Sequence, residues 1–256
     1  MNASLTVLGS GTSMGVPTIA CRCAVCRSND PHDRRTRPSI LIQYAARTVL
    51  IDTTPDFRTQ AIRENITQID AVLYTHAHAD HILGLDDLRP LSLTRPEKIP
   101  LYARADAADT IRRMFSYIFE PKYKFGGLAQ VDLHDIDGPL ELFGAQFEPV
   151  TVLHGDAEIF GYRFGSAAYL TDFSSIPESS FAQLRDLDVL FLDALRHTPH
   201  PTHSTVDNSL RIVERVQPKR AFFTHICHDL AHEATNATLP ANVRLAYDGM
   251  KLEFEI

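Results

Sequence analysis

The sequence predicts an α/β fold in which β-sheets pack together and helices cover the outside. Two observations predict this. Short apolar segments of strand length occur in both halves of the chain, and stretches with a helical apolar pattern separate them. The chain has 256 residues, 44% of them hydrophobic, so it can bury a sizeable core. We find no linker, internal repeat or low-complexity tract, and we expect a single domain over residues 1–256.

The first half contains four predicted strands and one predicted helix. The glycine-containing segment 9–12 is interpreted as a turn, because the spacing G-x-G-x-x-G is absent and no helical pattern follows it. The helix is expected to be capped by Thr53, Thr54 or Asp56, with Pro55 beside the cap. The predicted strands are residues 4–8, 39–44, 47–52 and 71–74, and the predicted helix is 56–65.

The second half alternates further strands and helices. Residues 86–100 are punctuated by proline and predicted to be irregular, and 121–127, with Tyr123 and Lys124, could form a lid. The tail 244–256 is predicted to be a hairpin around Asp248-Gly249. The other predicted elements are helices at 105–119, 178–185 and 205–216, and strands at 140–153, 159–164, 167–171, 188–193 and 220–224.

Composition excludes several classes of protein. The net charge of −7 argues against a broad surface for polyanions, although not against a small phosphorylated substrate. No run of about 18 apolar residues is present, so we expect no membrane span. The N-terminal residues lack the pattern of a signal peptide, and we expect a cytoplasmic protein.

Residues 71–81, A-V-L-Y-T-H-A-H-A-D-H, hold the densest cluster of metal-ligand types. A short apolar strand is followed at once by His76, His78, Asp80 and His81. Neutral imidazoles together with a carboxylate are typical of a divalent-metal site. The alternative is a solvated polar loop.

Three further candidates follow apolar strands, where a sheet delivers side chains to one rim. They are His154, Asp172 and His225, and His203 lies in the loop before a predicted helix. Each alone could be a capping histidine or a turn aspartate. Together with the cluster at 76–81, they supply two full coordination sets.

Cys21, Cys23 and Cys26 supply three thiolates within six residues, the spacing of a zinc knuckle in a reducing compartment. A structural zinc ion needs a fourth ligand, for which the candidates are His228, Cys227 and His32. The alternatives are packing as small hydrophobic residues or a redox relay.

The motifs T-H-A-H-A-D-H, V-L-H-G, Y-L-T-D and F-F-T-H, in this order, resemble the metallo-β-lactamase superfamily. The resemblance implies an αββα sandwich of two mixed β-sheets flanked by helices. It also implies that Asp52 orients the H-x-H loop, the alternative being a turn residue. The implied ligands are His76, His78 and His154 for one metal, Asp80, His81 and His225 for the second, and Asp172 as a bridge.

Together with G-S-G-T and C-x-C-x-x-C, the complete H-x-H-x-D-H motif resembles the PhnP-type phosphodiesterases. These are phosphoribosyl cyclic phosphate hydrolases with an added structural zinc. The resemblance implies that His228 completes the knuckle, with Cys227 left open, and that two divalent ions, Zn²⁺ or Mn²⁺, occupy the active site. Relatives are often dimers, so a homodimer is expected.

The predicted function is hydrolysis of small phosphodiesters, cyclic ones included, with Asp80 and His203 as the catalytic residues. Paired metal ions would activate a water molecule. His203 would protonate the leaving oxygen, and its H-S-T context resembles the phosphodiesterase branch that includes tRNase Z. His197 and His200 compete for this role.

Three other functions remain open. Processing of tRNA 3′ ends would need a basic arm, which we do not find, so we expect no nucleic-acid partner. A thioesterase or lactonase could use the same metals, and a metal-stabilised scaffold would have no activity. Arginines that could clamp a phosphate, or lie on a solvated surface, are Arg34, Arg35, Arg37 and Arg196.

Overall fold

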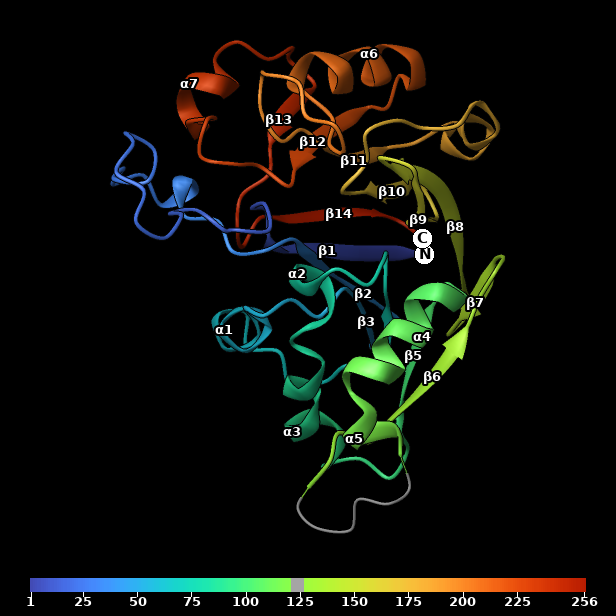
Figure 1. Ribbon diagram of the computed structural model, residues 1–256. Coiled ribbons are helices and arrows are strands. Elements are labelled where there is room, and N and C mark those ends of the chain that lie inside the picture. Colours follow the sequence, from blue (N-terminus) through green and yellow to red (C-terminus); the bar gives the residue numbers. More distant parts are fainter. Residues whose placement is uncertain (121–126) are drawn as a thin grey trace.

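The computed structural model describes residues 1–120 and 127–256, so Tyr123 and Lys124 lie outside the described residues. Within these ranges, two seven-stranded sheets face each other and helices cover their outer faces (Figure 1). The strand orders are β14-β1-β2-β3-β4-β5-β6 and β13-β12-β11-β10-β9-β8-β7. The predicted αββα sandwich of two mixed sheets is confirmed.

Both sheets combine an antiparallel half with a parallel half. In the first sheet, pairing is antiparallel from β14 to β3 and parallel from β3 to β6. Its strands are β1 (Asn2–Gly9), β2 (Ser39–Tyr44), β3 (Arg47–Ile51), β4 (Ala71–Leu73), β5 (Ile99–Ala103), β6 (Val131–Asp135) and β14 (Lys251–Glu255). In the second sheet, pairing is antiparallel from β7 to β10 and parallel from β10 to β13. Its strands are β7 (Leu140–Leu142), β8 (Ala145–His154), β9 (Ala157–Phe164), β10 (Ala167–Leu170), β11 (Val189–Asp193), β12 (Arg220–Thr224) and β13 (Val243–Leu245).

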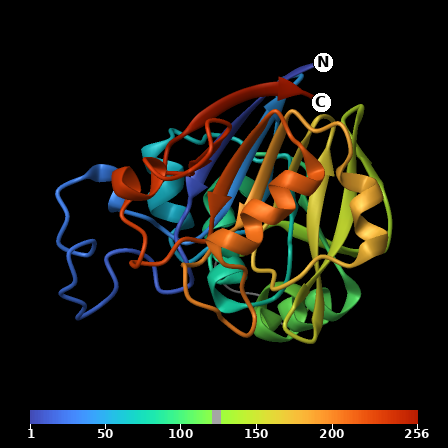
Figure 2. The same cartoon turned by 90° about the horizontal axis from the view of Figure 1, so that it is seen from above.

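The helices lie on the two outer faces of the sandwich, as Figures 1 and 2 show from two directions. The first sheet is covered by α1 (Phe57–Arg63), α2 (Ala79–Ile82), α3 (Arg89–Ser92), α4 (Ala105–Met114) and α5 (Ser116–Phe119). The second is covered by α6 (Val206–Val216) and α7 (His232–Asn236). Short 3-10 helices are η1 (Pro31–Asp33), η2 (Leu85–Leu88) and η3 (Glu178–Leu184).

The alternation of side chains along β11 shows how the layers are held together. Val189 and Phe191 pack in the core between the two sheets, whereas Leu190 and Leu192 pack in the core beneath α6. Successive residues of a strand point to opposite faces, so an uninterrupted apolar strand is buried on both sides. The sandwich therefore holds its strand ends in fixed positions, from which the loops of the site extend.

Several predicted elements differ from the structure. The helix predicted at 105–119 breaks at Phe115, whose backbone leaves the helical region and separates α4 from α5. Residues 178–185 form the 3-10 helix η3, and 140–153 contains the two strands β7 and β8. Residues 86–100, predicted to be irregular, contain α3 and the start of β5.

The predicted C-terminal hairpin is wrong. A turn does occur at Gly249, which has a φ of 89°, but the strands on its two sides join different sheets. β13 pairs with β12 and β14 pairs with β1, because the carboxylate of Asp248 is anchored by Ser10 and Thr36. The tail therefore connects the two sheets.

The segment 9–12 contains glycine because backbones approach closely there. A Cβ atom on Gly11 would lie 2.8 Å from the Arg35 carbonyl oxygen. The Gly11 N–H donates to Thr36 O, and the Thr12 N–H donates to Ile226 O.

In the described part of the chain, no helix has the length and apolar character that a membrane crossing requires.

Candidate metal centre

The ends of strands from both sheets converge at one edge of the sandwich. β3, β4, β8, β10 and β12 each end within three residues of a polar candidate, and three of these candidates have a positive φ. The φ values are 65° at Asp52, 57° at Asp172 and 56° at His225. Such a conformation costs about 1–3 kcal/mol per residue, and non-glycine residues adopt it mainly where function requires it. The sharp turns direct these side chains into a common space.

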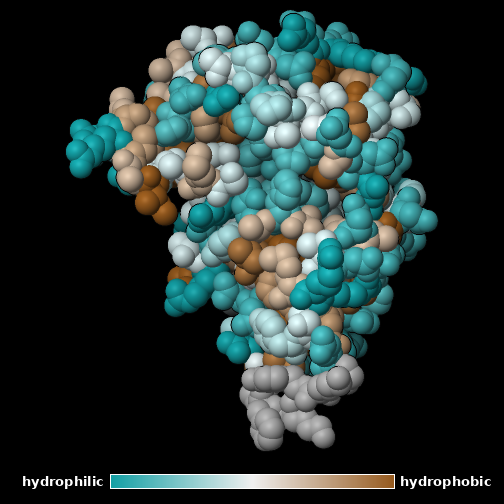
Figure 3. Space-filling view, viewed as in Figure 1, coloured by the Kyte–Doolittle hydropathy of each residue, from teal (hydrophilic) through white to brown (hydrophobic). Residues whose placement is uncertain are grey.

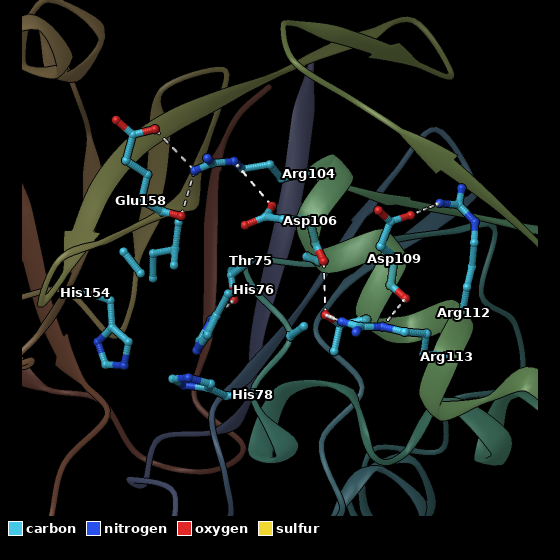
Figure 4. Close-up of a pocket in the computed structure, with 15 residues that line it drawn as sticks. Thr75, His76, His78, Arg104, Asp106, Asp109, Arg112, Arg113, His154 and Glu158 are labelled. Atoms are coloured by element: carbon cyan, nitrogen blue, oxygen red, sulfur yellow. Dashed lines mark hydrogen bonds and ion pairs between the residues drawn. The ribbon is translucent and has the colours of Figure 1, made fainter.

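The first set of side chains is His76, His78 and His154, whose ring nitrogens lie within 4.8 Å of one another. The ring centroids of His78 and His154 are 5.0 Å apart, and Figure 4 shows the three rings facing one another. Burial lowers the pKa of all three imidazoles, most strongly for His76. They are therefore neutral at pH 7, which is the form that binds a metal ion.

The second set is Asp80, His81, Asp172 and His225, all of them buried. One oxygen, Asp172 Oδ2, lies 3.1 Å from His225 Nε2 and 3.4 Å from His81 Nε2. The same oxygen lies 3.9 Å from His76 Nε2, in the first set. Asp172 thus stands between the two sets, where a bridging ligand would be.

Divalent ions fit the orphaned atoms of this site. His76 Nε2, His81 Nε2, His225 Nε2 and Asp80 Oδ2 are buried and have no hydrogen-bond partner. Leaving four such groups unpaired costs about 1–3 kcal/mol each, so a native protein satisfies them with a ligand. Nitrogen and carboxylate oxygen are the donors that zinc and manganese accept.

Asp52 holds Thr75 and His81 in place. Its Oδ1 accepts from the Thr75 N–H at 2.9 Å, its Oδ2 accepts from the Thr75 hydroxyl at 2.8 Å, and the same Oδ2 lies 2.7 Å from His81 Nδ1. The last contact leaves His81 Nε2 for the metal, as in carboxylate–histidine–metal arrangements. His154 Nδ1 is held in the same way by the Thr202 carbonyl, 2.8 Å away. The family resemblance implied that Asp52 orients the H-x-H loop, whereas the role of Thr202 was not predicted.

His203 lies at the centre, stacked on His225 with ring centroids 4.6 Å apart. Its Nδ1 is 2.8 Å from Oδ2 of Asp193, a carboxyl that sequence reasoning missed. Burial raises the pKa of Asp193 well above its usual range, and burial with the nearby His225 lowers the pKa of His203 to about 4. Both shifts disfavour a charge on this pair, which lies beside the proposed metal ligands. Asp193 ends an apolar strand, the signal that identified Asp172.

The competing candidates lie farther out or elsewhere. The ring of His200 is 5.0 Å from that of His203, and its Nδ1 accepts from the Thr202 N–H. The guanidinium of Arg35 is buried in an ion pair with Asp33, so it supports the fold. Arg37 pairs with Asp56, and Arg34 and Arg196 donate to nearby carbonyls.

The cysteine knuckle forms around His228. Its Nδ1 lies 3.1 Å from Cys21 Sγ, 3.7 Å from Cys23 Sγ and 3.4 Å from Cys26 Sγ. None of the three is in a disulfide, and the four side chains form one potential metal site. Cys227 is buried elsewhere, where its sulfur accepts from the Asp229 N–H, and the His32 ring packs on His232. His228 therefore fits the fourth position better than the other two candidates.

Replacing His228 by alanine should remove one metal ion per chain and leave the two at the strand ends. The expected stoichiometry is three ions in the wild-type protein and two in the variant, because three thiolates alone make an incomplete zinc site. Mild chelation should remove the active-site pair first, and the variant should unfold at a lower temperature. Metal analysis per chain and thermal unfolding test this. The matched control is His134→Ala, at an exposed position on β6, which should retain three ions.

A cavity of about 830 Å³ opens beside the first histidine set. Its near wall contains His76, His78 and His154, and its far wall contains Arg104 and residues of α4 (Figure 4). The metal centre is therefore accessible to a small molecule.

Comparison with known proteins agrees with this geometry. Residues 47–226 match the family model of the beta-lactamase superfamily domain. A crystal structure described as a new diphosphatase from the PhnP family is 62% identical, with a TM-score of 0.94, over 99% of this chain and 98% of that one. Zn²⁺-bound PqqB from Methylobacterium extorquens has a TM-score of 0.79 at 19% identity, over 97% of this chain and 99% of that one, and shares the fold.

A curated relative has a different kind of name. A protein of Porphyromonas gingivalis named octanoyltransferase is 37% identical over 250 residues, which are 96% of this chain. The chain spans half the length of that protein. The name therefore applies to a much longer molecule.

Proposed function

Because the chain belongs to the beta-lactamase superfamily and, within it, to the PhnP type of metal-dependent hydrolases, we propose that it hydrolyses small phosphodiesters at a dinuclear metal site. The observation that carries the proposal is the position of Asp172 Oδ2, within 4 Å of histidine nitrogens from both ligand sets. If two metal ions were bound, an oxygen in this position could serve as a ligand to both of them. We propose His76, His78 and His154 for one ion, Asp80, His81 and His225 for the other, and Asp172 for both.

Two bound divalent ions would supply a water of lowered pKa and would neutralise the oxygens of the phosphoryl group. Other residues of the chain would hold the proposed ligands in position. Asp52 fixes the ring of His81 and, through Thr75, the start of the H-x-H segment. The Thr202 carbonyl fixes His154.

The leaving oxygen needs a proton, and the Asp193–His203 pair is the group placed to give it. Burial disfavours a charge on either group, and His203 packs against both His225 and His154. A proton on the Asp193 carboxyl passes to His203 Nδ1 as the imidazole releases its Nε2 proton to the leaving oxygen. His203 is thus the general acid and Asp193 its positioning residue.

Diphosphates are a second class of substrate. The PhnP-family protein that is 62% identical to this chain is described as a diphosphatase. Hydrolysis of a diphosphate ester is also displacement at phosphorus with an oxygen leaving group, so the same ligands would serve. The phosphoribosyl cyclic phosphate predicted from the resemblance remains a proposed member of the first class.

A substrate panel tests the proposal. Protein loaded with Zn²⁺ or Mn²⁺ should hydrolyse bis(p-nitrophenyl) phosphate, and the metal-free protein should not. Thioesters, lactones and a tRNA precursor should be hydrolysed at least about a hundredfold less efficiently, a difference of about 2.7 kcal/mol in transition-state binding. Efficient hydrolysis of a thioester or lactone without any phosphodiester activity would overturn the proposal.

A further inference from the structure

We propose that His32, His232 and Glu233 form a further, weaker site for a divalent transition-metal ion such as Zn²⁺, apart from the strand ends and the cysteine knuckle. Each residue offers one ligand atom, and the three atoms lie within 4.8 Å of one another. Two imidazoles and a carboxylate suit Zn²⁺, Co²⁺ or Ni²⁺, whereas Mg²⁺ and Ca²⁺ prefer oxygen ligands. None of these residues is a proposed ligand of the active-site pair, so the site does not depend on the proposed function.

The fold brings the three residues together from two distant segments. His32 lies in η1, whereas His232 and Glu233 are the first two residues of α7. The segment that contains η1 lies beside α7 in both Figure 1 and Figure 2. The rings of His32 and His232 have centroids 4.6 Å apart, and Tyr247 packs on His32 with ring centroids 4.2 Å apart. Packing therefore holds the two imidazoles next to each other.

One nitrogen of this cluster lacks a partner. His232 is only 5% exposed, and its Nδ1 is buried with no hydrogen bond to any described residue. Packing of the rings does not satisfy this atom, and a buried polar atom without a partner is unfavourable. Burial, with His32 and Arg35 nearby, lowers the pKa of His232, so the ring is neutral at pH 7, the form that binds a metal ion. A bound ion would provide the partner that this ring lacks.

The surroundings of the cluster favour a cation. Asp30 Oδ1 lies 3.5 Å from His32 Nδ1, so a carboxylate faces one nitrogen of that ring and leaves the other for a metal ion. The His232 N–H donates to Asp33 Oδ1, which also accepts from the Arg35 guanidinium. Together with the glutamate of the cluster, these groups are three carboxylates and one guanidinium. Their net negative charge favours a divalent ion.

The site is open, so its ion should bind more weakly than the ion of the knuckle. Glu233 is exposed, and the side chain of His32 retains 37% of its accessible surface. An ion here should be lost on dialysis, so the three ions expected above are those that remain. On the side where Figure 1 shows α7, Figure 3 shows hydrophilic and hydrophobic residues intermingled rather than one broad apolar surface. This side therefore favours a small ion over an apolar protein partner.

A bound ion would join two segments that already meet beside the knuckle. Arg35, three residues after His32, donates to the carbonyl oxygens of Cys227 and Leu230. His228, the proposed fourth ligand of the knuckle, lies between these two acceptors in the sequence. The ion should stabilise this junction. Because the site exists only in the folded protein, added Zn²⁺ should raise the unfolding temperature.

Counting zinc at two free-metal concentrations tests the site. The wild-type protein should hold one more ion per chain in equilibrium dialysis against micromolar Zn²⁺ than after dialysis against metal-free buffer. His32→Ala should hold the same number under both conditions, because one histidine and one exposed carboxylate make an incomplete site. Asp30→Ala, which loses only the carboxylate beside His32, should bind the additional ion about tenfold more weakly.

His134→Ala is the matched control, since it removes an exposed imidazole on β6 and should keep the additional ion. After dialysis, His32→Ala should retain as many ions as the wild-type protein, which would show that the variant is folded. Added Zn²⁺ should raise the unfolding temperature of the dialysed wild-type protein but not that of His32→Ala. No additional ion in the wild-type protein, or an additional ion in His32→Ala, would overturn this inference and leave the proposed function untouched.

Discussion

Asp172→Asn should lower kcat for phosphodiester hydrolysis by about a thousandfold or more, because it removes the carboxylate that we propose is shared by two metal ions. One Asp172 oxygen lies 3.1 Å from His225 Nε2 and 3.9 Å from His76 Nε2. An asparagine oxygen has no negative charge to offset two divalent ions. We also expect the variant to bind at least one metal ion fewer per chain.

The measurement combines kcat with metal analysis of the same preparation. Asp207→Asn is the matched control, since Asp207 lies exposed in the first turn of α6 and the same charge is removed. The control should retain wild-type activity and metal content. A variant at Asp172 with full metal content and unchanged kcat would contradict a bridging role.

The parts of the centre that sequence reasoning identified share a local signal. His76, His78, Asp80 and His81 are close in sequence, so they are necessarily close in space. His154, Asp172 and His225 each follow an apolar strand, and sheet packing brings such strand ends to one edge. The fold class followed from the same strand pattern.

The remaining parts depend on tertiary contacts that no local pattern encodes. Asp193 ends an apolar strand as other candidates do, but only the fold shows that its carboxyl lies 2.8 Å from the ring of His203. The knuckle ligand was ambiguous because Cys227 and His228 are adjacent, and the choice depends on which of the two side chains faces the three thiols. Arg104 belongs to no motif, and its place follows from the junction of β5 and α4.

The same reason explains the errors in the fold. A short strand pattern does not specify its partner, so the C-terminal tail, predicted to be a hairpin, proved to be shared between two sheets. The helical pattern at 105–119 continues through Phe115, although the backbone there does not. The apolar periodicity of a sequence indicates which face of a helix is buried, but it does not indicate where the helix breaks.

The second large effect is expected at His203, and it should depend on the leaving group. With an alkyl phosphodiester, whose leaving alkoxide must be protonated, His203→Ala should lower kcat by about a hundredfold to ten-thousandfold. With bis(p-nitrophenyl) phosphate the loss should be below about tenfold, because p-nitrophenolate leaves without a proton. Such a difference separates proton donation from a general structural defect, which would slow both substrates alike.

The partner of His203 should show the same selectivity. Asp193→Asn keeps the size of the side chain but loses the carboxyl proton, so the alkyl ester should again be hydrolysed much more slowly than the nitrophenyl ester. His200→Ala, whose ring is 5.0 Å from that of His203, is the neighbouring control and should change the ratio of the two rates by less than about threefold. If His200→Ala shows the leaving-group dependence and His203→Ala does not, the acid is His200. An Asp193–His203 pair without net charge would let a proton donor persist beside two divalent ions, since such a pair would add no positive charge to the site.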